Sequence, residues 1–159
     1  MVNVLPIATT VMAALLSIEP LRIDGYAALT PASTLMATYH WTIYRPDLLP
    51  ALPLFTIGLI QDLLSGGLPG ETAIMLLLAR AILLHHRQYF VDRHFPFIWA
   101  GFTLLAGGAM LFLWALHSLL AGAVLELREP VFRAVVTISM FPIASFLLGR
   151  SQRAMIGAE

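Results

Sequence analysis

The sequence contains no cysteine, no lysine and few charged residues of any kind. Without cysteine, the chain has no disulfide framework, no thiolate metal site and no cysteine nucleophile. Charged residues make up only 11% of the chain, whereas a soluble domain averages about 25%. Because 59% of the residues are apolar and the mean hydropathy is +0.85, there is too little polar surface to cover a water-soluble globule. This composition predicts a small membrane protein.

All nine basic residues are arginine, and nine acidic residues balance them to a formal net charge of zero. The missing lysine is typical of a bias in genomic base composition and is not read as a functional choice. A neutral chain does not favour nucleic acid as the main partner, because that contact depends on an excess of positive charge. We therefore expect the lipid bilayer and other proteins as partners.

Long apolar stretches alternate with short charged turns along the whole chain. A helix needs about 20 mostly apolar residues to cross the hydrocarbon core of a membrane, which is about 30 Å thick. The third and fourth stretches are short, and no stretch is left for a soluble domain. The sequence predicts an all-α polytopic membrane protein in which residues 1–159 form a single six-helix domain, with spans at about 3–18, 26–44, 51–64, 71–87, 96–122 and 132–149.

The distribution of arginine predicts the orientation, because short loops rich in arginine stay in the cytoplasm. The first segment lacks the basic start and the cleavage site of a signal peptide, so we expect it to persist as a helix. Loops on one side carry Arg45, Arg87, Arg93, Arg150 and Arg153, whereas those on the other side carry Arg22, Arg128 and Arg133. The richer set is expected inside, which places both termini in the cytoplasm.

Small residues recur every seven positions in the fifth span, at Gly101, Gly108, Ala115 and Gly122. Seven residues fall about 20° short of two full turns, so these positions keep to one face of the helix. Small side chains let helix backbones approach closely in a membrane. We expect this face to pack within the bundle, and the alternative is a contact with a partner. The span is longer than the bilayer core, so its outer end should project from the membrane unless the helix tilts.

Two ionisable residues, Asp62 and Arg80, fall inside predicted spans, where charge is costly and faces protein or water. A direct pair between them is disfavoured, since their expected depths in the membrane differ. Arg80 can instead extend toward the inner interface or toward His40. Asp62 can accept backbone N–H groups of the Gly66-Gly67 turn. We favour these structural interpretations over a proton relay, and we expect Glu71 to be favoured by the dipole of the helix that it opens.

Two turns punctuate the middle of the chain. The segment from Leu64 to Gly70 contains three glycines and a proline, which predicts a tight turn with positive φ at some positions. It lacks the Lys and Ser or Thr that follow a phosphate-binding loop. In the other turn, Arg45-Pro46-Asp47, the proline stops the preceding helix. Asp47 can cap the next helix, although Pro50 and Pro53 shift its start.

The five histidines and the carboxylates do not form a recognisable catalytic or metal-binding pattern. His85 and His86 are adjacent and point to different helix faces, His94 lies in a loop, and His117 stands alone on an apolar helix. No ligand pair has the i, i+4 spacing of a helical metal site. No Ser-His-Asp set or paired intramembrane carboxylates indicate hydrolysis. We therefore expect a protein that is not an enzyme and that uses neither a metal nor a cofactor.

The run from Tyr39 to Gly70 resembles the signature region of the MreD family, the rod shape-determining membrane proteins of bacteria. The likeness rests on an aromatic-rich helix end, then Arg45-Pro46-Asp47, and then an ordered series of further residues. These are Phe55, Gly58-Leu59, Asp62-Leu63-Leu64, Ser65-Gly66 and Pro69-Gly70. Chain length and hydropathy agree along the whole chain, whereas outside residues 39–87 the resemblance is mostly one of hydropathy.

The resemblance implies a non-enzymatic scaffold in the bacterial inner membrane that takes part in cell elongation, peptidoglycan synthesis and the maintenance of rod shape. It implies MreC as the direct partner, and MreB, RodA and a penicillin-binding transpeptidase as indirect ones. The family is similar in fold to the membrane substrate-binding subunits of energy-coupling-factor transporters. Gly58, Asp62, Gly66 and Gly70 are expected to hold the local fold that the partner recognises.

Two rival functions stay open at this point. A transporter subunit that binds a small, vitamin-like molecule could use the polar Gln61-Asp62 step beside the glycine-rich loop, although few polar groups converge there. An intramembrane enzyme would have to use His40, Asp62 or His117, and it is the weaker of the two.

Overall fold

The structure of the chain is a computed structural model that describes residues 4–18, 32–91 and 93–156, and the regular elements within these ranges are all helical. They are α1 (Val4–Ile18), α2 (Ser33–Tyr44), η1 (Pro46–Leu48), α3 (Ala51–Ser65), α4 (Glu71–His86), η2 (Arg87–Tyr89), α5 (Phe95–Ala121) and α6 (Arg128–Ile156), where η denotes a short 3₁₀ turn. The predicted all-helical fold with six main helices is confirmed over the described residues. Positions 26–31 of the second predicted span lie outside them.

Among the described residues, two helices are long and apolar enough to cross a membrane, judged by length and composition. They are Phe95–Ala121, which is all of α5, and Arg128–Arg150 of α6. Shorter apolar segments, Pro6–Ser17 and Ala51–Ser65, lie in α1 and α3. The six helices therefore occupy the expected stretches of sequence, but their lengths do not establish six membrane spans.

The middle helices end where proline or glycine interrupts the chain. Pro46 has no N–H to continue a helix, and α2 ends two residues before it, at Tyr44. Gly66 follows α3 with φ of 70°, and Gly70 precedes α4 with φ of 93°. Residues with a side chain rarely adopt this left-handed conformation. The positive φ predicted for the glycine-rich turn is thus confirmed at these two positions.

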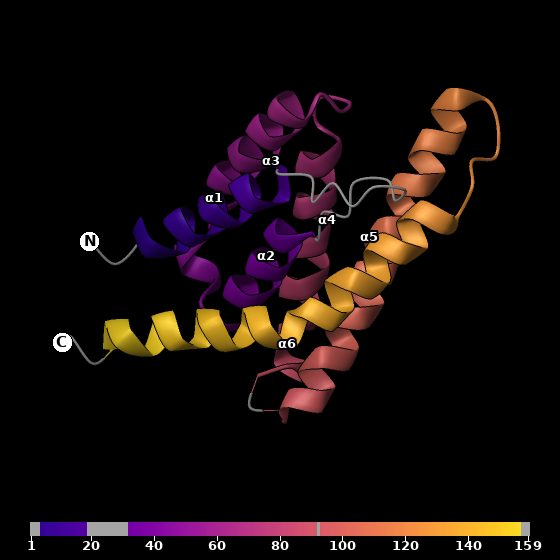
Figure 1. Ribbon diagram of the computed structural model, residues 1–159. Helices are drawn as coiled ribbons and strands as arrows, with labels where there is room; N and C mark the ends of the chain where they lie inside the picture. Colours follow the sequence, from indigo (N-terminus) through magenta and orange to yellow (C-terminus); the bar gives the residue numbers. More distant parts are fainter. Residues whose placement is uncertain (1–3, 19–31, 92, 157–159) are drawn as a thin grey trace.

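Helix α2 is the centre of the molecule, and its residues from Thr34 to Ile43 are all buried. Figure 1 shows α1, α3, α4 and α6 arranged around it. Polar groups of α2 and of the residue before it donate to four neighbouring helices: Trp41 to Thr9 of α1 (3.0 Å), Thr34 to Gln61 of α3 (2.8 Å), Tyr39 to the Ile98 carbonyl of α5 (2.7 Å), and the Ala32 N–H to Thr137 of α6 (3.1 Å). These bonds offset the cost of burying polar groups away from water.

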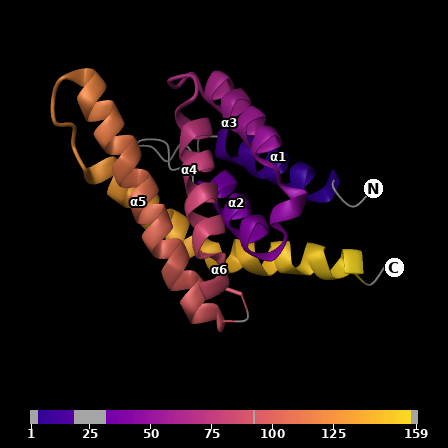
Figure 2. The same cartoon turned by 180° about the vertical axis from the view of Figure 1, so that it is seen from behind.

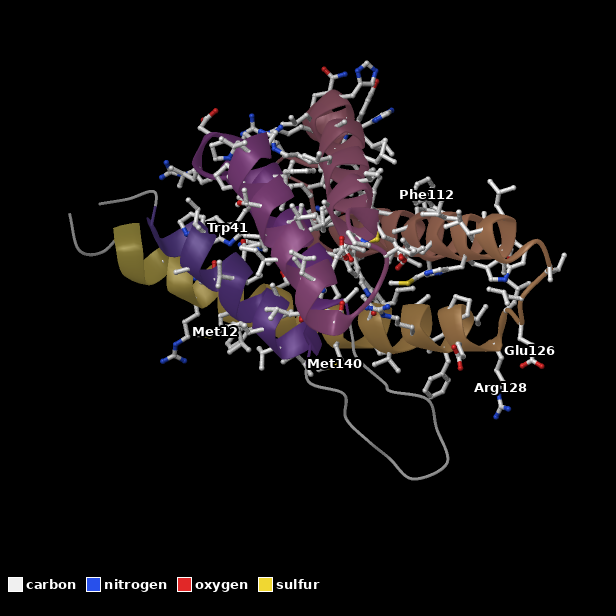
Figure 3. All side chains as sticks on the ribbon, turned by 90° about the horizontal axis from the view of Figure 1, so that it is seen from above. Met12, Trp41, Phe112, Glu126, Arg128 and Met140 are labelled. Carbon is white, nitrogen blue, oxygen red and sulfur yellow. The ribbon has the colours of Figure 1, made fainter. Side chains whose placement is uncertain are left out.

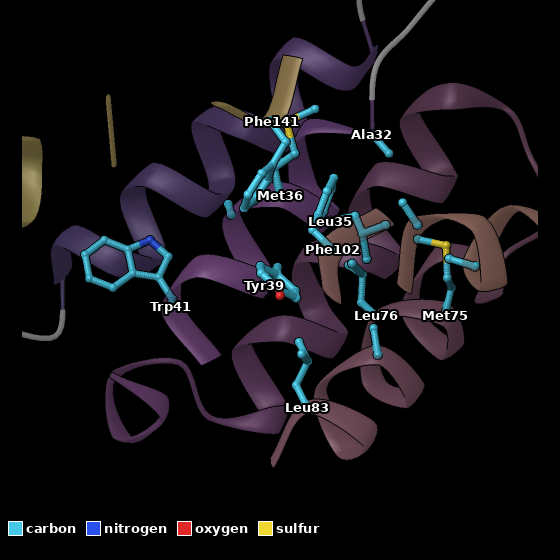
Figure 4. Close-up of a cluster of buried hydrophobic side chains, with 14 of the residues drawn as sticks. Ala32, Leu35, Met36, Tyr39, Trp41, Met75, Leu76, Leu83, Phe102 and Phe141 are labelled. Carbon is cyan, nitrogen blue, oxygen red and sulfur yellow. The ribbon is translucent and has the colours of Figure 1, made fainter. Parts of the chain in front are cut away.

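Aromatic rings join α2 to the α5–α6 hairpin. The Tyr39 ring meets Phe102 and Phe141 edge-on, with centroids 5.2 and 5.5 Å apart, while Phe102 and Phe141 stack at 4.1 Å. Figure 4 shows Tyr39, Phe102 and Phe141 within the buried cluster and Trp41 on the opposite side of α2. Such ring pairs add to the burial of their surface, so α2 is held on two faces.

Helix α6 is longer than predicted and changes direction partway along. Its expected ends, 132 and 149, were placed beside charged residues. The helix instead begins earlier, at Arg128, and continues past Arg150 and Arg153. The first half follows α5 and the second half turns away (Figure 1). Pro142 lies inside the helix and cannot donate to the carbonyl of Ile138, which instead accepts the indole N–H of Trp99 at 3.1 Å. Proline explains the bend, and Trp99 satisfies the carbonyl that it frees.

Helices α3 and α4 approach most closely at Gly58. A Cβ atom on Gly58 would lie 2.6 Å from the Cα and 2.8 Å from the backbone N of Ala73. Both residues are buried. Since the obstacle is backbone, a side chain at residue 58 requires the two helices to separate.

Substitution Gly58→Ala should therefore destabilise the protein by about 1–3 kcal/mol, as overpacking does. Gly107→Ala is the matched control, because a Cβ at Gly107 meets nothing within 4 Å and alanine favours the helix. Thermal unfolding of both purified variants in mild detergent measures the effect. Equal melting temperatures for the two variants would contradict the proposed close approach.

Candidate functional site

Asp62 stabilises the glycine-rich turn between α3 and α4 through hydrogen bonds to the backbone. Its carboxylate accepts the backbone N–H of Gly70 at 3.0 Å and that of Thr72 at 3.0 and 3.1 Å. The first N–H groups of a helix have no partner inside it, and a carboxylate there also complements the helix dipole. Asp62 is 3% exposed. A buried charge of this kind ties the end of α3 to the start of α4.

The prediction for Asp62 was right about the type of partner and wrong about its identity. Its carboxylate binds N–H groups at the start of α4, not those of Gly66 and Gly67. The N–H groups of Gly66 and Gly67 bond instead to the backbone carbonyl of Asp62. Such bonds are typical of a helix that ends in a left-handed glycine.

Arg80 fastens the other end of the same hairpin. Its Nε donates to the carbonyl of Leu49 at 3.0 Å, just before α3 begins. Arg80 was expected to extend toward the inner interface or toward His40, and the Leu49 carbonyl was not named as its partner. A neighbouring arginine acts in the same way, because Arg87 Nε donates to the Ile43 carbonyl of α2 at 2.9 Å. Both side chains satisfy carbonyls at helix ends, which lack partners within their helices.

The Arg45-Pro46-Asp47 segment forms a compact turn in which only Pro46 is buried. Arg45 closes α2 through its N–H, which bonds to the Trp41 carbonyl at 2.8 Å. Asp47 had been expected to cap α3, but it does not. The N-cap position belongs to Pro50, with no side-chain cap, because the prolines move the helix start beyond the reach of Asp47.

Glu71 and His117 form a close polar contact that the sequence reasoning missed. Glu71 Oε2 lies 3.0 Å from His117 Nε2, so the histidine expected to stand alone is paired. Arg133 of α6 interacts electrostatically with the same carboxylate. Each of these residues lies within two turns of the end of its helix. If the predicted spans are aligned by their depth in the membrane, Glu71, His117 and Arg133 fall at the same level.

The glycine-alanine face of α5 is only partly packed. A Cβ on Gly101 would overlap the ring of Phe90 and lie 2.8 Å from the hydroxyl oxygen of Tyr39. Gly108 and Ala115 are exposed, whereas Gly122 ends the helix with φ of 65°. The expectation that the whole face packs within the bundle was therefore wrong beyond Gly101. The buried face lies beside it and carries Ile98, Phe102, Ala106, Ala109, Met110 and Leu113.

The connection between α5 and α6 forms an exposed apolar tip, which we define as residues 119–127. Leu119 and Val124 are 79% and 85% exposed. The tip is nevertheless ordered, because Trp114 Nε1 donates to the Leu125 carbonyl at 3.0 Å and the Leu125 N–H donates to Ser118 at 3.3 Å. Figure 3 shows Glu126 and Arg128 here, at the far end of the hairpin. The tip lies at the same end of the molecule as the glycine-rich turn (Figure 1).

A groove of about 520 Å³ lies between α4 and α5. Seen from behind in Figure 2, α5 crosses α4 and then diverges from it. The lining is apolar apart from His86 and Tyr89, and it includes Gly101 and Gly108. Within the described ranges, no group of three or more His, Asp or Glu side chains could hold a metal ion.

Replacing Asp62 by alanine should lower the free energy of unfolding by about 1–3 kcal/mol, because two part-buried N–H groups lose their acceptor. Asp47→Ala is the matched control, since Asp47 is exposed and makes no cap, and a change within about 0.5 kcal/mol is expected there. Thermal unfolding in detergent compares the two. A loss at Asp47 as large as that at Asp62 would refute the capping role.

Comparison with known proteins does not assign the chain to a family. No protein-family model and no curated protein matches its sequence, and no solved structure matches its fold. The residues of the α3–α4 and α5–α6 hairpins therefore provide the basis for a functional proposal.

Proposed function

We propose that the chain is a non-enzymatic scaffold of the bacterial cell-elongation complex, related to the MreD family, that binds MreC in the inner membrane and so helps position peptidoglycan synthesis. In this proposal six helices cross the membrane in an arrangement similar to the substrate-binding subunits of energy-coupling-factor transporters. Both termini lie in the cytoplasm. MreB, RodA and a penicillin-binding transpeptidase are reached through MreC.

The observation that carries the proposal is that residues of the MreD-like segment, together with Arg80, hold α3 and α4 against each other. Gly58 brings α3 against α4, Asp62 binds the first N–H groups of α4, and Arg80 binds the turn before α3. Gly66 and Gly70 supply the left-handed turn residues. Their tasks are architectural, as a scaffold requires, and none of these contacts positions a group for a reaction.

The rival reading as a vitamin-binding subunit gains no support at the place where it was expected. Gln61 Oε1 accepts a hydrogen bond from Thr34, and the Asp62 carboxylate binds Gly70 and Thr72. Both side chains are buried and engaged within the protein. A polar ligand site needs a few polar groups that converge on a cavity, and these two are already committed to the fold.

The tip offers a surface for MreC. Soluble surfaces rarely carry contiguous exposed apolar side chains without a partner. As a helix of 27 residues, α5 is about 40 Å long, which exceeds a hydrocarbon core of about 30 Å. If its first residue, Phe95, lies at the inner interface, the tip reaches beyond the outer one. It would then meet the part of a partner that lies outside the membrane.

The distribution of charge supports the proposed orientation. Arg45, Arg87 and Arg93 lie at the end of the molecule opposite the tip. Arginine-rich connections face the cytoplasm, so in this proposal the tip lies outside. Helix α2 is short for a spanning helix, but it is enclosed by protein and does not have to match the bilayer itself.

The test is co-purification with MreC from membranes after mild solubilisation. The paired substitutions Leu119→Ala and Val124→Ala should reduce the recovered MreC, because apolar surface at the contact is lost. Leu52→Ala is the matched control, since Leu52 of α3 is also highly exposed but lies far from the tip.

Thermal unfolding establishes that all variants are folded. If MreC is recovered equally with the tip variant and the Leu52 variant, the tip is not the contact. If MreC is absent even with the unaltered chain, and depletion of the chain leaves rod-shaped cells with normal wall growth, the scaffold proposal fails.

A further inference from the structure

The groove between α4 and α5 has the size and lining of a site for a chain-like apolar molecule. Its volume of about 520 Å³ falls within the range of about 300–1,000 Å³ that small-molecule sites occupy. Leu78 and Ile82 of α4 form one wall, whereas Leu104 and Phe112 of α5 form the other. A partner helix measures about 10–12 Å across with its side chains, so a single hydrocarbon chain suits the groove better.

Glycine makes the groove deep on the α5 side. Gly101 lets α5 approach Tyr39 and Phe90, and a Cβ on Gly108 would meet nothing within 4 Å. Gly108 lines the groove, while Gly107, its neighbour in the helix, does not. Any larger residue at position 108 would project into the groove without first meeting the rest of the protein.

Polar groups lie at one end of the groove only. His86 ends α4 and Tyr89 belongs to η2, and both line the groove. The Nδ1 atom of His86 is 3.0 Å from the Ile82 carbonyl, which fixes the ring. An apolar channel with polar side chains at a single end matches an amphiphile that has one tail and one polar head.

Arg93 is connected to the lining at that end through two aromatic rings. The guanidinium carbon of Arg93 lies 5.7 Å from the centre of the Phe97 ring. Phe97 in turn contacts Phe90, a lining residue, with ring centroids 5.7 Å apart. Arg93 therefore lies within two ring contacts of this end of the groove, and arginine favours phosphate.

We propose that the α4–α5 groove binds an anionic phospholipid, with an acyl chain along Gly108 and the phosphate of the headgroup at the end formed by His86, Tyr89 and Arg93. This inference rests on the membrane location in the proposed function but not on MreC. The groove ends at the side with more arginine, so the lipid belongs to the cytoplasmic leaflet, whose anionic lipids attract basic side chains.

The test measures lipid retained by the purified protein after reconstitution with equal amounts of phosphatidylglycerol and phosphatidylcholine. Native mass spectrometry counts each bound lipid. We expect phosphatidylglycerol to be retained about tenfold better than phosphatidylcholine, because both lipids carry the phosphate but only phosphatidylcholine brings a choline cation that Arg93 repels. Gly108→Leu should abolish retention of both lipids by filling the groove, and Gly107→Leu is the matched control that should retain them.

A second variant separates the headgroup from the tail. Arg93→Gln should leave lipid bound but remove the preference for phosphatidylglycerol. Equal retention of the two lipids by the unaltered chain overturns the proposal, as does equal loss in the Gly107 and Gly108 variants at unchanged melting temperature. Recovery of MreC from the same preparations keeps the two proposals distinct. If the unaltered chain binds MreC but shows no preference for phosphatidylglycerol, only the lipid site is refuted.

Discussion

Burial of polar side chains on α2 is the constraint around which the other helices are arranged. A helix enclosed on all sides must satisfy its indole, phenol and hydroxyl groups inside the protein, since neither lipid nor water reaches them. Trp41, Thr34 and Tyr39 do so by bonding to α1, α3 and α5. Each bond has a defined direction, so it fixes the position of the neighbouring helix more narrowly than apolar packing alone. Within the described part of the chain, the Thr42 hydroxyl is the one buried side-chain group without a partner.

The charged residues extend this principle to the loops. Asp62 satisfies N–H groups at the start of α4, and Arg80 satisfies a carbonyl in the turn before α3. The two therefore hold opposite ends of one hairpin. The chain has few charged residues, and these two stabilise the α3–α4 hairpin. The proposed contacts with other molecules are therefore made by the apolar surfaces of the tip and the groove.

Sequence alone predicted the order and type of the helices because proline and glycine act locally. Pro46 and Gly66 end helices whatever surrounds them. The errors arose where a charge was taken as the end of a helix, as beside Arg133 and Arg150, or where spacing was taken as contact. Gly101 packs against Phe90 and Tyr39, whereas a Cβ on Gly108 would meet nothing within 4 Å, and no heptad pattern encodes this difference. The pairing of Glu71 with His117 joins residues far apart in sequence, so it depends on how the helices assemble.

The three tryptophans illustrate a last consequence of this architecture. Each indole N–H is bonded, and each bond crosses a different junction: Trp41 to α1, Trp99 to α6, and Trp114 to the tip. Indole emission depends on the polarity and hydrogen bonding around the ring. The chain therefore carries an intrinsic optical reporter at each of three separate joints. Chains that keep one tryptophan at a time would show which joint loosens first on heating and which responds to a bound protein or lipid.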